Sequence, residues 1–260
     1  MSGMKKRIII AILVVGAIIA GGAIFARNAY FLPILMYHSV DINDKITNIF
    51  ISPGSFERQM KFLHKNNYNV ISLSEAADYI KNRRRPPYRT VAITFDDGYY
   101  NNYEYAYPVL KRYGIKATLF VIVDKIGQPG WVGWKELEEM SDSGIITIGS
   151  HTKTHPWLTG LSIEGIKNEF DASKRILEEK LGKNIDLLCY PMGEYDRRSE
   201  DIANRSGYIC AVGTNPGRSS SVRDIYAMGR IKISDSSDNL FIFWFETTGY
   251  YKYFKWGMRR

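Results

Sequence analysis

The sequence predicts an α/β protein in which helices cover a parallel sheet, and two observations lead to this fold class. Short apolar runs of strand type alternate with segments of helical period from residue 34 to residue 212. Neither an internal repeat nor a low-complexity linker interrupts the alternation, which indicates one domain. Parallel strands joined by covering helices form either an open sheet or a (β/α) barrel, and both bind ligands at the carboxyl ends of their strands.

The expected elements follow one another along the chain. The predicted strands are residues 34–37, 91–95, 117–123, 145–148, 185–190 and 208–212. The predicted helices contain Phe56, Met60 and Leu63, then residues 103–113, 134–140 and 163–181, of which the last is ended by Gly182. Residues 240–245 are strongly aromatic and predict a helix that closes the barrel, with interfacial membrane contact as the alternative.

The N-terminal segment predicts a membrane anchor. Residues 8–26 are apolar and uncharged, and as a helix they would be roughly 28 Å long, close to the thickness of a bilayer core. Lys5, Lys6 and Arg7 precede them, so the positive-inside rule places residues 1–7 in the cytoplasm and residues 27–260 outside it. A cleaved signal peptide, giving a secreted protein, is the alternative.

Charge and cysteine content restrict the function classes. Lys and Arg number 35 against 27 Asp and Glu, and this net charge of +8 suits an anionic polymer, a membrane surface or nucleic acid. The basic residues are scattered and no recognition motif accompanies them, so nucleic-acid binding is not expected. Cys189 and Cys210 are too few for a disulfide framework, and both a single disulfide and two separate buried thiols remain open.

Two carboxylates stand at the end of the strand that residues 90–95 form. Asp96 and Asp97 are followed by Gly98, which permits a tight turn and the close approach of a ligand. Adjacent carboxylates are costly unless a cation or a shared proton relieves them. An ordinary Asp-Gly turn is the alternative.

Two of the four histidines follow another strand end. His151 and His155 lie four residues apart, so both rings can reach one metal ion, and one carboxylate would complete a site of two His and one Asp with open positions. The second carboxylate, left free, could take a proton from the water that the metal activates. Two histidines of a surface loop are the alternative.

Three motifs together resemble the NodB-homology polysaccharide deacetylases of carbohydrate esterase family four. Residues 94–98 (Thr-Phe-Asp-Asp-Gly) resemble the first motif of that family, residues 150–155 (Ser-His-Thr-Lys-Thr-His) the second and residues 189–195 the third. The resemblance implies a distorted (β/α) barrel, a divalent metal ion that is usually zinc, and hydrolysis of N-acetyl groups on amino sugars. It also implies that Asp97, His151 and His155 are the metal ligands and that Asp96 is the general base.

The sequence departs from that family in two places. Many members carry an arginine that tethers the catalytic Asp in the third motif, where this chain has Cys189, and many carry a late histidine as general acid, whereas no histidine follows His155. His38, at the end of the first strand, resembles the early histidine of the poly-N-acetylglucosamine deacetylases and is the candidate acid. A structural hydrogen-bonding role is the alternative for His38.

Three further residues are candidates for contact with the substrate or with the oxyanion of the reaction. Tyr190 and Met192 belong to the third motif. Arg230 stands near a predicted strand end and could replace the missing arginine tether.

The sequence therefore predicts a membrane-anchored, metal-dependent N-deacetylase with zinc as its cofactor. Its expected partners are the membrane, through the N-terminal helix, and an envelope or exported glycan that resembles poly-N-acetylglucosamine or peptidoglycan. Alternatives are an O-acetyl esterase, a deformylase or deacetylase of a lipid-linked sugar, and a non-catalytic glycan-binding barrel. Retention of both Asp and both His residues of the motifs argues against the non-catalytic alternative.

Overall fold

A computed structural model describes residues 2–42, 49–214, 224–234, 237–251 and 254, and within the first helix it describes the side chains of residues 7–22. The strands are β1 (Ile34–Tyr37), β2 (Ser39–Val40), β3 (Phe50–Ile51), β4 (Asn69–Ile71), β5 (Thr90–Phe95), β6 (Ala117–Val121), β7 (Ile146–Ser150), β8 (Leu187–Cys189), β9 (Cys210–Gly213), β10 (Met228–Gly229) and β11 (Ile231–Lys232). The α-helices are α1 (Ser2–Ala29), α2 (Pro53–Lys65), α3 (Leu73–Lys81), α4 (Tyr107–Tyr113), α5 (Trp134–Asp142), α6 (Ile163–Leu181), α7 (Arg197–Arg205) and α8 (Leu240–Thr247). A π-helical turn (Asn102–Ala106) precedes α4.

The main sheet is parallel and nearly closes into a barrel. Its strand order is β10-β9-β8-β7-β6-β5-β1-β11, with β4 paired to the first half of β5. The segment 228–232 pairs with β9 through β10 and with β1 through β11, so both edges of the sheet meet on one short stretch of chain. The predicted α/β class with parallel strands is confirmed, and the architecture is the barrel rather than the open sheet.

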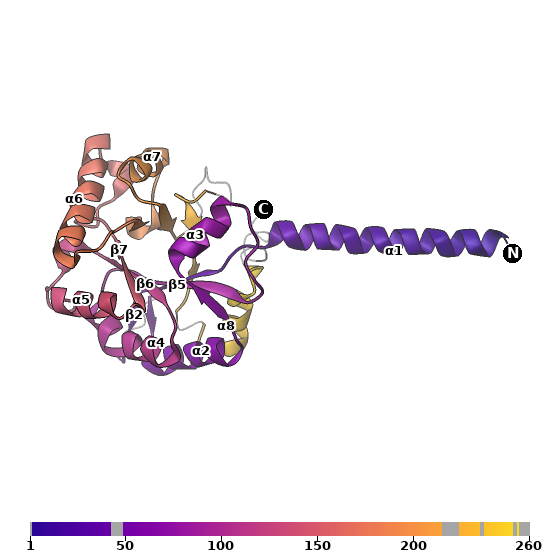
Figure 1. Cartoon of the computed structure of the whole chain (residues 1–260), viewed down its shortest axis with the longest axis horizontal. Coiled ribbons are helices and arrows are strands. Elements are labelled where there is room, and N and C mark those ends of the chain that lie inside the picture. Colours follow the sequence, from indigo (N-terminus) through magenta and orange to yellow (C-terminus); the bar gives the residue numbers. More distant parts are fainter. Residues whose placement is uncertain (1, 43–48, 215–223, 235–236, 252–253, 255–260) are drawn as a thin grey trace.

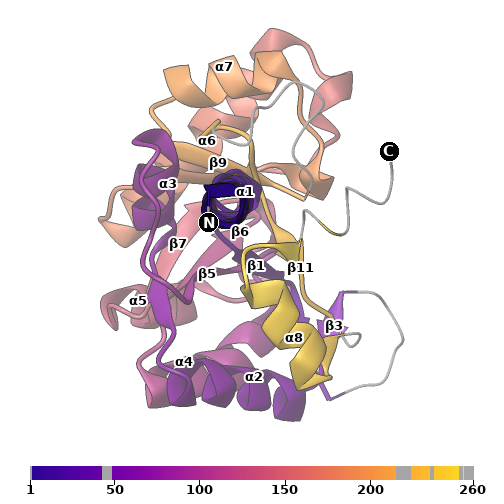
Figure 2. The same cartoon turned by 90° about the vertical axis from the view of Figure 1, so that its right-hand side faces the viewer.

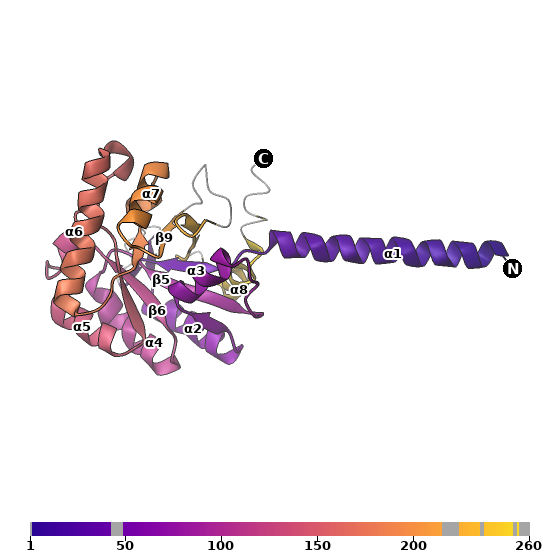
Figure 3. The same cartoon turned by 45° about the horizontal axis from the view of Figure 1, so that its top comes forward.

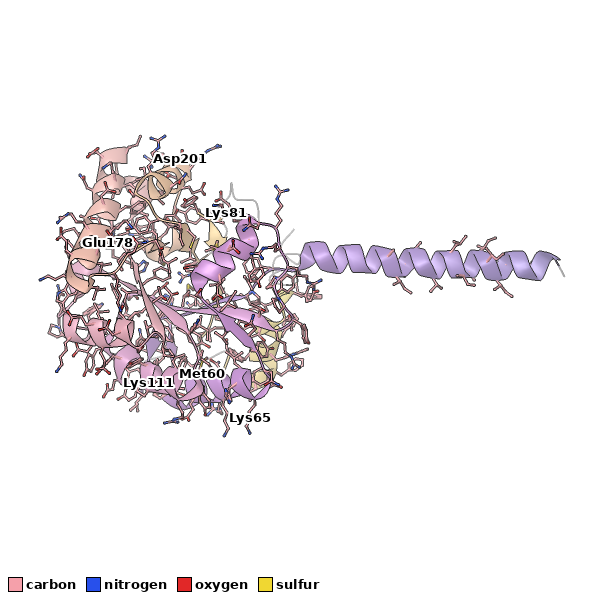
Figure 4. All side chains as sticks on the ribbon, in the orientation of Figure 1. Met60, Lys65, Lys81, Lys111, Glu178 and Asp201 are labelled. Carbon is pink, nitrogen blue, oxygen red and sulfur yellow. The ribbon has the colours of Figure 1, made fainter. Side chains whose placement is uncertain are left out.

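Helices surround the barrel and supply the outer layer of the core. Figures 1 and 3 show α2, α4, α5, α6 and α7 arranged around the strands, and their charged side chains, such as Lys65, Lys111, Glu178 and Asp201, lie on the outside (Figure 4). All six residues of β5 are buried because apolar side chains cover both faces of the strand. Burial on this scale holds the barrel together without covalent cross-links.

The predicted elements agree with the structure except near their ends. The strand expected at residues 117–123 stops at Val121, because Val123 begins a 3₁₀ turn. The long helix runs over Ile163–Leu181 and ends at Gly182, which takes a left-handed conformation (φ 61°) as the cap. The predicted elements did not include β2, β3, β4, α3 or α7, and the strand end predicted near Arg230 lies at β10 and β11.

The N-terminal segment is helical, but its predicted span of a membrane is not supported. Helix α1 extends away from the barrel (Figure 1). A bilayer-spanning helix needs about 20 consecutive, mostly apolar residues. No helix in the described part of the chain is both long and apolar enough to cross a membrane. The transmembrane anchor expected at residues 8–26 is therefore unsupported, and the placement of residues 1–7 in the cytoplasm stays a prediction.

The two cysteines are free and buried. They lie on the neighbouring strands β8 and β9, but Cys210 pairs in register with Leu187, and Cys189 pairs with Val212. The two cysteines are therefore offset by about 6.6 Å along the strands and by about 4.8 Å between the strands. The resulting separation exceeds the reach of a disulfide.

Candidate active site

Adjacent strand ends bring the predicted catalytic groups together. Tyr37 and Phe95 are register partners at the carboxyl ends of β1 and β5, so the residues that follow them, His38 and Asp96, leave the sheet side by side. His38 Nε2 lies 3.9 Å from Asp96 Oδ2, which is an electrostatic contact and longer than a hydrogen bond. Two strands along, His151 follows the end of β7.

Asp97 and Gly98 turn the chain sharply after β5. Both residues have left-handed backbone conformations, with φ 70° for Asp97 and 77° for Gly98. A Cβ atom at position 98 would lie 2.9 Å from Cγ1 of Val121, so only glycine fits there. The left-handed conformation at Asp97 is unfavourable for a residue with a side chain, and such strain concentrates at functional sites.

Asp97, His151 and His155 form the predicted three-residue cluster. Asp97 Oδ1 lies 3.5 Å from His151 Nε2 and 3.8 Å from His155 Nε2, and the ligand atoms of all three residues lie within 4.8 Å of one another. Atoms bound about 2.0–2.1 Å from a tetrahedral ion are separated by about 3.3–3.5 Å. The donor set and its spacing therefore fit a zinc-like divalent ion with positions left open for other ligands.

The surroundings orient the ring of His151 and favour the neutral form of His155. His151 is buried, and the carbonyl oxygen of Cys189 lies 2.9 Å from its Nδ1, so a proton on Nδ1 is hydrogen-bonded and Nε2 is left to face Asp97. Burial, together with the charge of His151, lowers the pKa of His155 and favours the neutral ring that a metal ligand requires. Burial would raise the pKa of Asp97, but the hydrogen bond and charge of His151 outweigh it and hold that pKa below its ordinary value.

Arg230 binds the carboxylate of Asp96 with both ends of its guanidinium group. Nη1 donates to Oδ1 at 2.6 Å and Nη2 donates to Oδ2 at 2.7 Å, and both side chains are almost completely buried. Burial alone would raise the pKa of Asp96, but the charge and hydrogen bonds of Arg230 outweigh it and hold that pKa well below its ordinary value. Asp96 is therefore ionised at neutral pH and fixed in orientation.

The same guanidinium group contacts Cys189, the residue that stands at the place of the family's tethering arginine. Nη2 of Arg230 lies 3.1 Å from Sγ of Cys189, and Nη1 donates to Oγ1 of Thr94 at 3.1 Å. Asp96, His151 and Cys189 form a second group of side chains of metal-binding type. The guanidinium group of Arg230 already contacts two of them, Asp96 and Cys189. This leaves the cluster around Asp97 as the candidate metal site.

His38 lies beside this centre, and its ring is only slightly accessible. The side chain is 17% exposed, and its Nδ1 is buried without a hydrogen-bond partner among the described residues. Burial lowers the pKa of His38, and the charge of Asp96 opposes this only in part. A partly desolvated imidazole next to an ionised carboxylate can exchange a proton with a bound ligand near neutral pH.

The structure does not bring the Tyr190 side chain to this group. Alternate residues of a strand face opposite sides of a sheet, so Cys189 faces Arg230 while Tyr190 points to the outer layer. The Tyr190 hydroxyl donates to the carbonyl oxygen of Tyr226, and its ring stacks on Tyr195 with centroids 4.5 Å apart. Met192 lies in the turn after β8 with φ 57° and a half-exposed side chain, at the same end of the barrel as the carboxylates.

Glu169 of α6 was missed by the sequence reading, although it holds the loop between the two histidines. Its carboxylate accepts hydrogen bonds from the backbone N–H groups of Lys153 and Thr154 at 2.9 and 2.8 Å and from the hydroxyl of Thr154 at 2.8 Å. The contact joins residues that are 15 or 16 positions apart, so no local pattern reveals it. Three bonds to one carboxylate restrict the positions that His151 and His155 can take.

A barrel whose strand ends carry a two-His, one-Asp cluster beside a buried, ionised carboxylate has the arrangement that hydrolases with a bound metal ion and a general base use. Comparison with known proteins identifies the family. The family model described as polysaccharide deacetylase matches residues 83–211. YxkH of Bacillus subtilis (strain 168), named as a polysaccharide deacetylase, is 37% identical over 203 residues, which cover 78% of this chain and 71% of the relative. The chain belongs to the polysaccharide deacetylase family.

Other relatives support the same assignment. Poly-β-1,6-N-acetyl-D-glucosamine N-deacetylase of Staphylococcus aureus (strain MSSA476) is 28% identical over 224 residues, covering 81% of this chain and 77% of the relative. The solved structure of the Streptococcus pyogenes deacetylase PplD in complex with acetate has a TM-score of 0.74 at 30% identity and covers 81% of this chain and 96% of its own. IcaB from Ammonifex degensii has a TM-score of 0.72 at 25% identity, with 84% and 97% covered.

Proposed function

We propose that the protein is a metal-dependent N-deacetylase that removes acetyl groups from N-acetylglucosamine units of a poly-β-1,6-linked type of glycan. The observation that carries this proposal is the cluster of Asp97, His151 and His155 beside Asp96, whose carboxylate Arg230 keeps ionised. The substrate class is supported by the Staphylococcus aureus relatives, which are named for that polymer.

Asp97, His151 and His155 would hold the metal ion, with zinc as the first candidate because two imidazoles and one carboxylate match its ligand preference. When bound, a divalent ion at this place supplies Lewis acidity toward an amide carbonyl and a water molecule. Side chains of the protein carry out the proton transfers. Asp96 accepts the proton of the attacking water, because its carboxylate is ionised and held by Arg230.

His38 then donates a proton to the amide nitrogen as the C–N bond breaks, so that acetate and a free amino sugar leave. Its position beside Asp96 supports this role, because base and acid must act on the same substrate group. Arg230 positions Asp96 and does not itself touch the substrate in this scheme. The attacking water supplies the oxygen atom that the acetyl group gains and, in net terms, the proton that the amine nitrogen gains.

We further infer that the deacetylase domain, residues 27–260, acts outside the cytoplasm, on an envelope or exported polysaccharide. The polymer named for the relatives supports this inference. Fusion of alkaline phosphatase to the end of the chain tests it, because phosphatase activity in intact cells requires export. An inactive but folded fusion would contradict an extracytoplasmic location.

The decisive experiment measures acetate released from β-1,6-linked N-acetylglucosamine oligomers by the purified protein, with chelator and with zinc added back. Release that chelator abolishes and zinc restores is the expected result. No release from a folded protein that binds zinc would overturn the proposed substrate. A folded protein that binds no divalent ion would overturn the metal-dependent mechanism and favour a glycan-binding role.

A further inference from the structure

A cavity lies at the other end of the barrel from the catalytic groups. Its volume is about 730 Å³, within the range of pockets that hold small molecules. Its lining includes Thr90, Arg85, Arg89 and several aromatic side chains. Thr90 is the first residue of β5, whereas Asp96 directly follows the last, so roughly 20 Å of strand separates the two places.

The cavity lies next to the base of α1. Tyr30 directly follows this helix, and Figure 2, which looks along α1 toward the barrel, shows α8 and β1 near its base. The described apolar side chains of α1, from Ile8 to Ile19, are between 52% and 68% exposed.

Half of the lining residues are aromatic. Tyr30 and Tyr250 pack edge to face with ring centroids 5.9 Å apart, and Phe245 packs against Phe254 at 5.7 Å. Tyr88 is 82% exposed and Trp244 is 40% exposed, although both rings border the cavity. Exposed aromatic surface around a concave site is typical of a place where an apolar group binds.

Among the described residues of the lining, only Arg85 and Arg89 are charged. Arg85 Nη2 lies 3.1 Å from the Tyr250 hydroxyl, and Arg89 Nη1 donates to the carbonyl oxygen of Asn66 at 2.9 Å, so both partners are neutral. Arg85 also stacks over the Tyr30 ring at 4.9 Å. Within the described residues neither guanidinium group forms an ion pair with a carboxylate. The described part of the cavity wall therefore presents two positive charges and no carboxylate.

We propose that this cavity binds an anionic amphiphile, a molecule with one phosphate or carboxylate group and an apolar chain. The anionic group pairs with Arg85 and Arg89, and the chain lies against the aromatic wall. Guanidinium groups bind carboxylate and phosphate groups through paired hydrogen bonds. The proposal does not depend on the deacetylase reaction.

A glycan fits this cavity less well than an amphiphile does. Sugar hydroxyl groups require acceptors as well as donors, and the described lining residues offer no carboxylate and no side-chain amide. A deacetylated glycan carries ammonium groups, which Arg85 and Arg89 would repel. The two arginines and the aromatic wall together match a ligand that is anionic at one end and apolar at the other.

Calorimetric titration of the full chain with octyl phosphate, below the concentration at which it forms micelles, tests the proposal. Inorganic phosphate and octyl glucoside are the two half-ligands, one without the chain and one without the negative charge. We expect octyl phosphate to bind at least about tenfold more tightly than either half-ligand, because both interactions act together. Equal affinity for octyl glucoside and octyl phosphate would overturn the proposal, as would the absence of saturable binding.

Variants show whether the binding is at this cavity. Arg85→Gln combined with Arg89→Gln should weaken octyl phosphate binding about tenfold or more, since each charge-assisted contact contributes substantially. Arg205→Gln, on the exposed face of α7, is the matched control and should bind as the wild type does. Binding to the apolar side chains of α1 would not depend on either arginine, so unchanged affinity in the double variant would contradict the proposal.

Two further measurements guard against misfolding and identify the source of the ligand. Arg85→Gln alone and Tyr88→Ala change only exposed side chains, and both should weaken binding while leaving the melting temperature unchanged. Flotation with vesicles of phosphatidylglycerol or of phosphatidylcholine distinguishes a lipid headgroup from a free amphiphile. If the arginine double variant floats less with phosphatidylglycerol vesicles than the wild type does, the ligand is a membrane lipid. If the double variant loses octyl phosphate binding but floats as the wild type does, the ligand is a free amphiphile.

Discussion

Arg230 donates one hydrogen bond to each carboxylate oxygen of Asp96, and it does so from the short segment on which the two edges of the sheet meet. A family member with arginine in the third motif would tether its aspartate from the position that Cys189 occupies here. In this chain the guanidinium group comes from the closing segment and contacts Cys189 Sγ instead. Closure of the barrel and orientation of the proposed base are therefore linked.

Removing the tether should destabilise the fold strongly. Arg230→Met leaves a carboxylate buried without a partner, and we expect the free energy of unfolding to fall by about 3–5 kcal/mol. Arg175→Met is the matched control, because Arg175 pairs with Glu179 on the exposed face of α6 and such pairs contribute about 1 kcal/mol or less. Urea unfolding measures both variants, and equal losses would show that the buried pair has no special weight.

The Asp96–Arg230 pair also predicts a pH dependence. The pKa of Asp96 is lowered in the folded state, so its contribution to stability is present above the unfolded value of about 3.9 and is lost as the pH falls through the folded value. The difference in unfolding free energy between wild type and Asp96→Asn should therefore be constant near neutral pH and shrink only below about pH 3.9. A difference that already shrinks between pH 7 and pH 5 would contradict this assignment.

His38 should matter for turnover and not for metal binding. His38→Gln is expected to lower kcat by about 10²–10⁴-fold, the usual contribution of a general acid, while zinc affinity stays at the wild-type value. Because the acid must be protonated, the fall in rate at rising pH should follow the lowered pKa of His38 and disappear in the variant. His64→Gln, an exposed histidine on α2 whose ring packs near Tyr113, is the control.

Glu169 should act on the metal site through the loop that it holds. Glu169→Ala removes the acceptor of three hydrogen bonds, and we expect zinc to bind about 10–100-fold more weakly, as is usual when support of a metal ligand is lost. Zinc affinity is measured by competition with a chromophoric chelator, so the result does not depend on activity. Glu164→Ala, an exposed residue of the same helix, should leave the affinity unchanged.

The two thiols should be unreactive in the folded protein. Burial raises the pKa of Cys189, and Arg230 opposes this only in part, while burial likewise raises the pKa of Cys210. A chromogenic disulfide reagent at pH 8 should therefore detect no thiol in the native protein and two in the denatured protein. Detection of none after denaturation without reductant would show that the cysteines are oxidised.

The sequence located most elements whose own pattern is strong, and it missed those whose signal is short. Strands β2, β3 and β4 have two or three residues each, too few for a period to be recognised. Helix α3 was missed although a capping box is present, with Ser72 and Glu75 bonding each other's backbone N–H groups. The long helix at Ile163–Leu181 was predicted to the residue because periodicity and a terminal glycine agree.

By itself the sequence determined the alternation of strands and helices and the positions of Asp96, Asp97, His151 and His155 after strand ends, because both are local consequences of residue order. The tertiary structure decided which distant groups meet. Arg230 reaches Asp96 across 134 positions of the chain only because the closing segment pairs on both sides. It also decided that Tyr190 points outward, since the direction of a side chain depends on the register and curvature of the whole barrel.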